Sequence, residues 1–159
     1  GHFPLLDNDQ ICHCGKTGCL ETGASGSAIH RIFIEKLREG RASVLSEKFN
    51  KGEDISLMDI LNAVNEEDVL AIEVIEGIGT VLGRALAGLI NIFNPELVVI
   101  GGVVAKVQEY LLLPVKSAIQ KHSLNMVNKD TSIKFSKLGE KAGPIGACML
   151  SRSKLLGLM

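Results

Sequence analysis

The sequence predicts an α/β protein that is rich in helix and forms part of a larger fold. Long segments place apolar residues at intervals of three and four, which is typical of helices. Two short segments, 97–100 and 132–138, have the apolar or alternating pattern of strands. Because a sheet usually has about five strands, two strands are too few for a complete parallel sheet. We therefore expect the rest of the sheet to lie outside these 159 residues.

Composition excludes several classes of protein. Hydrophobic residues make up 46% of the chain and charged residues 22%, which is typical of a globular protein rather than a disordered one. The formal net charge is -1 and Trp is absent, so these residues lack the basic field and stacking surfaces that nucleic-acid binding requires. No apolar run approaches the roughly 20 residues of a membrane span. We expect a cytoplasmic protein without a membrane partner.

The first third of the chain predicts a loop followed by helices. The apolar residues 1–6 are consistent with the end of a strand, and a helical pattern begins near Glu21 and ends at Gly40. The polar segment 41–53 predicts a surface loop. Ser56 is expected to cap a short helix.

The longest helical pattern runs from about 67 to 93 and contains several glycines. Because glycine costs about 1 kcal/mol relative to alanine in an exposed helix, we expect close approach of another helix or a subunit to compensate. Asn94, which precedes a proline, is expected to end this helix. The four glycines are Gly77, Gly79, Gly83 and Gly88.

The last third of the chain predicts two strands that alternate with helices. The apolar run 97–100 precedes a glycine pair and predicts a strand buried on both faces. Pro114 is expected to kink or split the helix that follows, and Cys148 is expected to be a small core residue. The expected elements are the strand 97–100, a helix at about 105–122, the strand 132–138 and a helix at about 144–155.

Three of the four cysteines are crowded into one glycine-bearing loop. Cys12, Cys14 and Cys19 could supply three thiolates to a zinc ion, which prefers four soft or borderline ligands in a tetrahedron. The fourth ligand would be His2 or His13, and the position of His13 between two cysteines favours His2. The alternative interpretation is a set of reduced cysteines without a metal.

These residues resemble the signature of the ROK family, which comprises repressors, open reading frames and sugar kinases. The resemblance begins with Gly1-His2, followed after an interval by CHCGKTGCLE at 12–21. It continues through NPELVVIGG at 94–102 and ends with AGPIGA at 142–147. It therefore extends over essentially the whole chain.

The resemblance implies an actin-like, hexokinase-like (ribonuclease H-like) fold of two lobes, of which residues 1–159 would form most of the C-terminal lobe. It implies a structural zinc ion (Zn2+) held by His2, Cys12, Cys14 and Cys19. It also implies that Glu21 contacts sugar hydroxyls and that His2 faces the sugar. The alternative role for Glu21 is that of an acidic residue at the start of a helix.

A nucleotide site is a weaker implication. Gly101 and Gly102 match the position of a family glycine triplet near the adenosine, but Val103 occupies the third place. The alternative interpretation is a tight turn between a strand and a helix.

Three functions follow from these observations. The first is the sugar-binding effector lobe of a transcriptional regulator of the N-acetylglucosamine repressor type, which would contact DNA only through an upstream domain. The second is the C-terminal lobe of an ATP-dependent sugar kinase, so ATP is expected only in that case, and this chain would lack the catalytic lobe. The third is a zinc-bearing dimerisation module. A small sugar or amino sugar is the expected ligand of the first two, and a homo-oligomer is expected.

Overall fold

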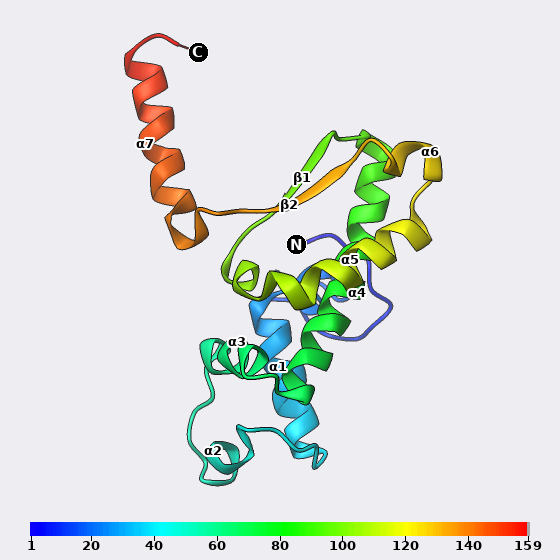
Figure 1. The fold of residues 1–159 in the computed structure, drawn as a ribbon, viewed down its shortest axis with the longest axis vertical. Coiled ribbons are helices and arrows are strands. Elements are labelled where there is room, and N and C mark those ends of the chain that lie inside the picture. The colour runs from blue at the N-terminus through cyan, green and yellow to red at the C-terminus, as the bar shows by residue number, and fades with distance from the viewer. Residues whose placement is uncertain (159) are drawn as a thin grey trace.

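The computed structural model describes residues 1–158, apart from the side chains of residues 127, 128 and 140. Helices dominate, and the two strands lie beside them in a small sheet (Figure 1). The elements in chain order are η1 (Leu20–Thr22), α1 (Gly26–Arg38), α2 (Ser46–Asn50), α3 (Leu57–Asn65), α4 (Val69–Phe93), β1 (Leu97–Ile100), η2 (Val103–Val107), α5 (Gln108–His122), α6 (Asn125–Asn128), β2 (Ser132–Phe135), η3 (Gly139–Lys141) and α7 (Ala142–Leu155).

The predicted long helix is present as α4, and α5 packs closely across it. A Cβ atom on Gly83 would lie 2.6 Å from the carbonyl oxygen of Val115 and 2.7 Å from Cβ of Ala118. Gly79 is similarly covered by α5, whereas Gly77 and Gly88 have open space around them. The expectation of close approach is therefore confirmed at Gly79 and Gly83, whereas no described helix of this chain covers Gly77 or Gly88.

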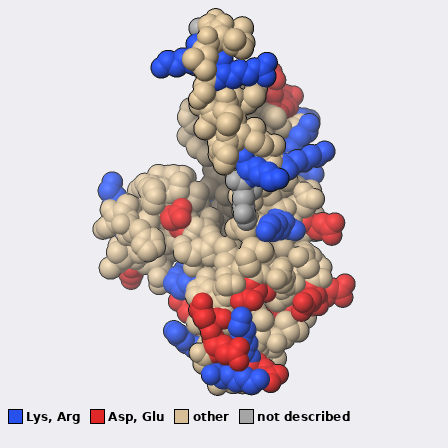
Figure 2. Space-filling view, turned by 90° about the vertical axis from the view of Figure 1, so that its left-hand side faces the viewer, with Lys and Arg blue, Asp and Glu red and all other residues tan. Residues whose placement is uncertain are grey.

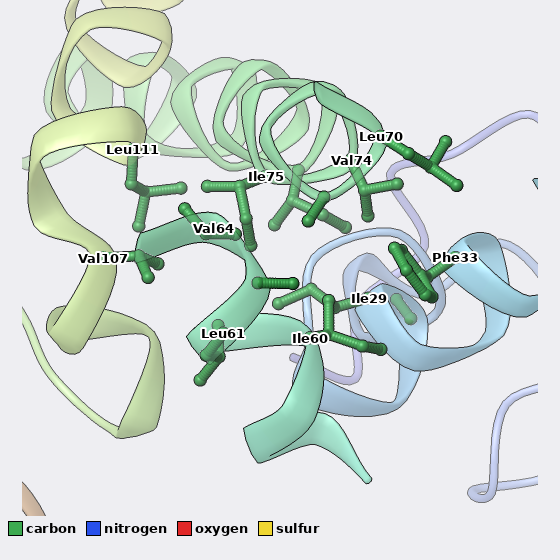
Figure 3. Close-up of a cluster of buried hydrophobic side chains, with 14 of the residues drawn as sticks. Ile29, Phe33, Ile60, Leu61, Val64, Leu70, Val74, Ile75, Val107 and Leu111 are labelled. Carbon is green, nitrogen blue, oxygen red and sulfur yellow. The ribbon is translucent and has the colours of Figure 1, made fainter. Parts of the chain in front are cut away.

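A single apolar cluster joins α1, α3, α4 and α5. Figure 3 shows Phe33 and Ile29 of α1 packed beside Ile60 of α3, with Ile75 of α4 and Leu111 of α5 on the other side. All five side chains are almost completely buried. This core fixes α1, and with it the segment that immediately precedes α1.

The sheet is buried on one face rather than on both. β1 and β2 are parallel, and Val98 pairs with Ile133 while Ile100 pairs with Phe135. These four side chains face the helical core. Leu97 and Val99 point the other way and are 48% and 57% exposed, because no described element covers that face. The prediction of a doubly buried strand is wrong for this reason.

The C-terminal helix α7 stands away from the other helices (Figure 1). It begins at Ala142, two residues before the expected start, and has no buried residue. Cys148 is exposed, so the expectation of a core cysteine is wrong.

Local signals explain where several helices begin and end. Ser56 caps α3 in a reciprocal capping box with Asp59, as predicted. Asn94 ends α4 in the left-handed region, with φ of 44°. The polar segment 41–53 contains the short helix α2, which its lack of apolar periodicity concealed.

Other bounds differ from the sequence prediction by a few residues. The long helix begins at Val69 rather than 67, and β2 ends at Phe135 rather than 138. The predicted helix at 105–122 is divided between η2 and α5. Pro114 lies inside α5, which continues unbroken to His122, so the expectation of a split helix is wrong.

Charged side chains of both signs cover one end of the molecule. Figure 2 shows basic and acidic side chains intermingled over the end of the molecule that contains α1 to α3. Within residues 1–158, no helix combines the length and apolarity required to cross a bilayer.

Candidate metal centre

The cysteine loop is shaped by two glycines and a pair of short backbone hydrogen bonds. Gly15 and Gly18 have φ of 83° and 69°, which few residues with a side chain adopt. The N–H of Cys12 donates to the carbonyl of Lys16 at 2.8 Å, and the N–H of Gly15 donates back to Cys12 at 2.8 Å. A Cβ atom on Gly18 would collide with the carbonyl oxygen of Leu6. The tight turn therefore brings the three cysteines together.

The N-terminal segment runs beside this loop and carries His2 to it. Pro4 and Cys19 form an antiparallel bridge, and the N–H of Leu20 donates to the carbonyl of Phe3 at 3.1 Å. The N–H of Glu21 donates to the carbonyl of Gly1 at 2.9 Å. The expected end of a strand is thus limited to an isolated bridge, but it suffices to place His2 next to the cysteines.

The ligand atoms of His2, Cys12, Cys14 and Cys19 all lie within 4.8 Å of one another. Sγ of Cys14 and Sγ of Cys19 are 3.6 Å apart, and Nδ1 of His2 is 3.3 Å from Sγ of Cys12. A tetrahedron with ordinary zinc bond lengths has S···S edges of about 3.8 Å and S···N edges of about 3.6 Å. Three thiols and one imidazole at these separations fit zinc in both chemistry and size.

His13 does not belong to this cluster. It is exposed on the loop between Cys12 and Cys14, and the group of candidate ligands contains His2 instead. The preference for His2 over His13 therefore agrees with the observed arrangement.

The thiols of the cluster have unequal acidity. A hydrogen bond from the backbone N–H of Lys16, assisted by the neighbouring thiols, lowers the pKa of Cys14 from 9.0 to about 7. Burial, together with the adjacent Cys14 and Cys12, raises the pKa of Cys19 to about 11. Cys14 is thus the group that first offers a thiolate, and a bound cation would favour loss of the proton from Cys19.

Glu21 lies immediately beyond the cluster, in η1 rather than at the start of α1. It is half-buried, and among the described residues its carboxylate has no side-chain hydrogen bond or ion pair. It lines a cavity of about 230 Å³ beside Cys12 and His13, together with Gln10 and Ser27. A half-buried carboxylate without a protein partner is able to accept hydrogen bonds from a ligand.

The glycine pair Gly101-Gly102, the candidate nucleotide site, lies at one edge of the small sheet. Gly101 and Gly102 follow β1, and Gly102 has φ of 84° before η2 begins. Gly102 and Val103 line a cavity of about 210 Å³ with Lys106 and Ser136, at the carboxyl ends of both parallel strands. This edge is where open α/β sheets commonly bind ligands.

Sequence reasoning missed Arg31, which lines the cavity next to Glu21. Its spacing from Glu35 predicts a helical ion pair, and the structure contains that pair at 3.0 Å. The sequence carries no signal for its second contact, with the carbonyl of Thr22 at 2.9 Å.

Comparisons with known proteins identify the family of this chain. The ROK family model matches residues 1–154. A glucokinase of Halalkalibacterium halodurans is 36% identical over 97% of this chain and 47% of its own length. The DNA-binding transcriptional dual regulator NagC of Escherichia coli is 31% identical over 100% of this chain and 38% of its own length. The chain thus spans about half or less of the curated relatives it matches.

Solved structures resemble the chain over most of its length. A ROK family transcriptional regulator, described as a homolog of the E. coli MLC protein, is 36% identical with a TM-score of 0.76, covering 85% of this chain and 33% of that one. A ROK family glucokinase from Streptomyces griseus, in complex with glucose and AMPPNP, is 27% identical with a TM-score of 0.83, covering 96% of this chain and 50% of that one. The chain therefore belongs to the ROK family and has the α/β fold of an actin-like C-terminal lobe.

Proposed function

We propose that this chain is the sugar-binding effector lobe of a ROK-family transcriptional regulator and that it contains a structural zinc. The observation that carries the proposal is the cluster of His2 and three cysteines directly before Glu21. Glu21 follows Cys19 by two residues, and its carboxylate, which has no partner among the described residues, lines the cavity of about 230 Å³. Metal ligands and a candidate sugar contact are thus parts of one short stretch of chain.

Zinc bound by His2, Cys12, Cys14 and Cys19 would cross-link the N-terminal segment to the loop. Four protein ligands fill a tetrahedron, so the role of the metal would be structural rather than catalytic. The cross-link would act on Glu21 through the hydrogen bond from its N–H to Gly1, next to His2. His2 itself is exposed, which is compatible with a second role facing the sugar.

Glu21 would bind the sugar through its hydroxyl groups. A carboxylate has two acceptor oxygens, and two adjacent hydroxyls on a sugar ring offer two donors at a matching separation. Glucose and N-acetylglucosamine are the sugars to test first, because the relatives include glucokinases and N-acetylglucosamine repressors.

The regulator is favoured over the kinase by the position after the glycine pair. Val103 stands where a third glycine would let the backbone approach a nucleotide. In a regulator, the sugar would bias the angle between two lobes, and DNA would be bound by another domain. We include a homo-oligomer in the proposal, for which the open surfaces at Gly77 and Gly88 of α4 offer contact positions.

A sugar kinase is the second candidate function, and the cavity at Gly102 is the observation that favours it. Lys106 and Lys137 line that cavity at the carboxyl ends of β1 and β2, where an anionic ligand such as ATP would be attracted. ATP belongs to the proposal only in this case.

Calorimetric titration of the complete protein with each sugar tests the role of Glu21. Glu21→Gln should weaken binding about 10- to 150-fold, because a hydrogen bond to a charged group contributes about 1.5–3 kcal/mol. Glu53→Gln, at an exposed position outside the site, should leave the affinity unchanged. Equal sugar affinities for Glu21→Gln and the wild type would contradict the proposal.

Phosphorylation assays distinguish the two functions. A regulator should show no ATP-dependent phosphorylation of glucose or N-acetylglucosamine and should lose DNA binding when sugar is added. Turnover of ATP and sugar by the complete protein would establish the kinase instead. Residues 1–159 alone should be inactive in either case, because phosphoryl transfer requires groups of both lobes.

A further inference from the structure

Arg31 connects helix α1 to the turn that contains Glu21. Its Nη2 donates to the carbonyl oxygen of Thr22 at 2.9 Å. Its Nη1 donates to both carboxylate oxygens of Glu35, at 3.1 and 3.0 Å. The guanidinium is therefore held from two directions, by a carboxylate one helical turn away and by the residue next to Glu21.

The same turn is fixed on its other side by the cysteine loop. The N–H and the Oγ1 of Thr22 both donate to the carbonyl of Cys19, at 2.9 and 2.8 Å. Thr22 is thus held by Cys19 of the candidate metal centre on one side and by Arg31 on the other. Because Glu21 is joined to Thr22 by one peptide bond, both contacts bear on where its carboxylate lies.

Arg31 and Thr22 also form a boundary between two cavities. Both residues line the 230 Å³ cavity of Glu21. Both also line a larger cavity of about 650 Å³, which lies between α1, α4 and the N-terminal segment. Loss of the Arg31 side chain would remove part of the wall between them and expose the turn to water.

We propose that Arg31 is a positioning residue that holds Glu21 in the orientation needed for sugar binding. The planar guanidinium suits this role, since Nη1 donates to both carboxylate oxygens of Glu35 while Nη2 reaches the carbonyl of Thr22. Lysine has a single nitrogen and cannot reproduce this geometry. The inference rests on the proposed contact between Glu21 and the sugar.

The test is a double-mutant cycle between Arg31 and Glu21 in the complete protein, with sugar affinity measured by calorimetry. Arg31→Ala should weaken binding of the sugar about tenfold, and Arg31→Lys should recover only part of that loss. In the Glu21→Gln background, Arg31→Ala should have a much smaller effect, because the charged contact that it positions is already gone. Arg38→Ala, an exposed arginine on the same helix, is the matched control and should have no effect.

Two further measurements separate positioning from a general loss of structure. Zinc content and far-ultraviolet circular dichroism should be the same in Arg31→Ala and the wild type. Amide hydrogen exchange at 22–24 should be faster in Arg31→Ala, and unchanged in Arg38→Ala.

The measurements distinguish failure of the positioning role of Arg31 from failure of the proposed function. If Glu21→Gln weakens binding but Arg31→Ala does not, the positioning role is overturned and the proposed function stands. Additive losses in the cycle would also overturn it, since they show that Arg31 acts independently of Glu21. If neither sugar binds the wild type, the proposed function fails, and unchanged amide exchange in Arg31→Ala would then overturn the positioning role as well.

Discussion

The residues around Glu21 differ in how far the sequence alone could predict their place in the candidate site. Cys12, Cys14 and Cys19 belong to a local motif, so their grouping in a candidate metal site could be predicted from their spacing alone. His2 was favoured over His13 on the sequence, but its place beside the cysteines depends on hydrogen bonds between the N-terminal segment and the loop, which no local pattern predicts. Arg31 could not be predicted, since the distance from α1 to Thr22 is fixed by tertiary packing.

Asp59 allows a pH prediction at the residue scale. Its carboxylate accepts hydrogen bonds from Lys48 and Ser56, which lower its pKa from 3.8 to about 2. A pKa lower in the folded state means that the stabilisation is complete above 3.8 and is lost as the pH falls through about 2. Its side chain is 32% exposed, so we discount the effect to about 1–2 kcal/mol.

Asp59→Asn should therefore lower the free energy of unfolding by about 1–2 kcal/mol at pH 7 and by much less near pH 2. Urea denaturation at a series of pH values measures this difference. Asp54→Asn, at an exposed position on the adjacent loop, is the control. A loss for Asp59→Asn that is the same at both pH values would show that the charge is not responsible.

At the scale of elements, the contact between α4 and α5 organises the molecule. Strong periodicity made these helices predictable to within a few residues, whereas α2 was missed because five residues carry too little pattern. Pro114 was expected to kink or split its helix, but it packs against Gly79 of α4 inside an α5 that is not split. Tertiary packing thus compensates a local penalty that the sequence alone would overestimate.

Substituting the glycines of α4 should have opposite effects according to what covers them. Gly83→Ala would push a methyl group into Val115 and Ala118 of α5, and we expect a loss of about 1–3 kcal/mol in unfolding free energy. Gly77→Ala enters open space on the same helix and should stabilise it by up to about 1 kcal/mol. Thermal denaturation of the two variants compares them directly. Similar shifts for both would show that α5 does not press on Gly83.

At the scale of the whole molecule, two surfaces remain uncovered by the described residues. The outer face of the sheet and the apolar residues of α7 are exposed, although the sequence predicted burial of both faces of the strand 97–100 and of Cys148. Burial of an apolar strand or helix depends on elements from elsewhere in the fold, so local pattern identified the elements but not their partners. The core of α1, α3, α4 and α5 involves neither surface, and no residue of the cysteine loop 12–19 belongs to it.

The central claim is that a zinc-organised loop presents Glu21 to a sugar. The measurement that tests it most directly is calorimetric titration of the complete protein with sugar before and after zinc is removed by a chelator. We predict one zinc per chain, a loss of at least about tenfold in sugar affinity on its removal, recovery when zinc is restored, and unchanged helical content throughout. Equal sugar affinity in the zinc-loaded and zinc-free proteins would contradict the account.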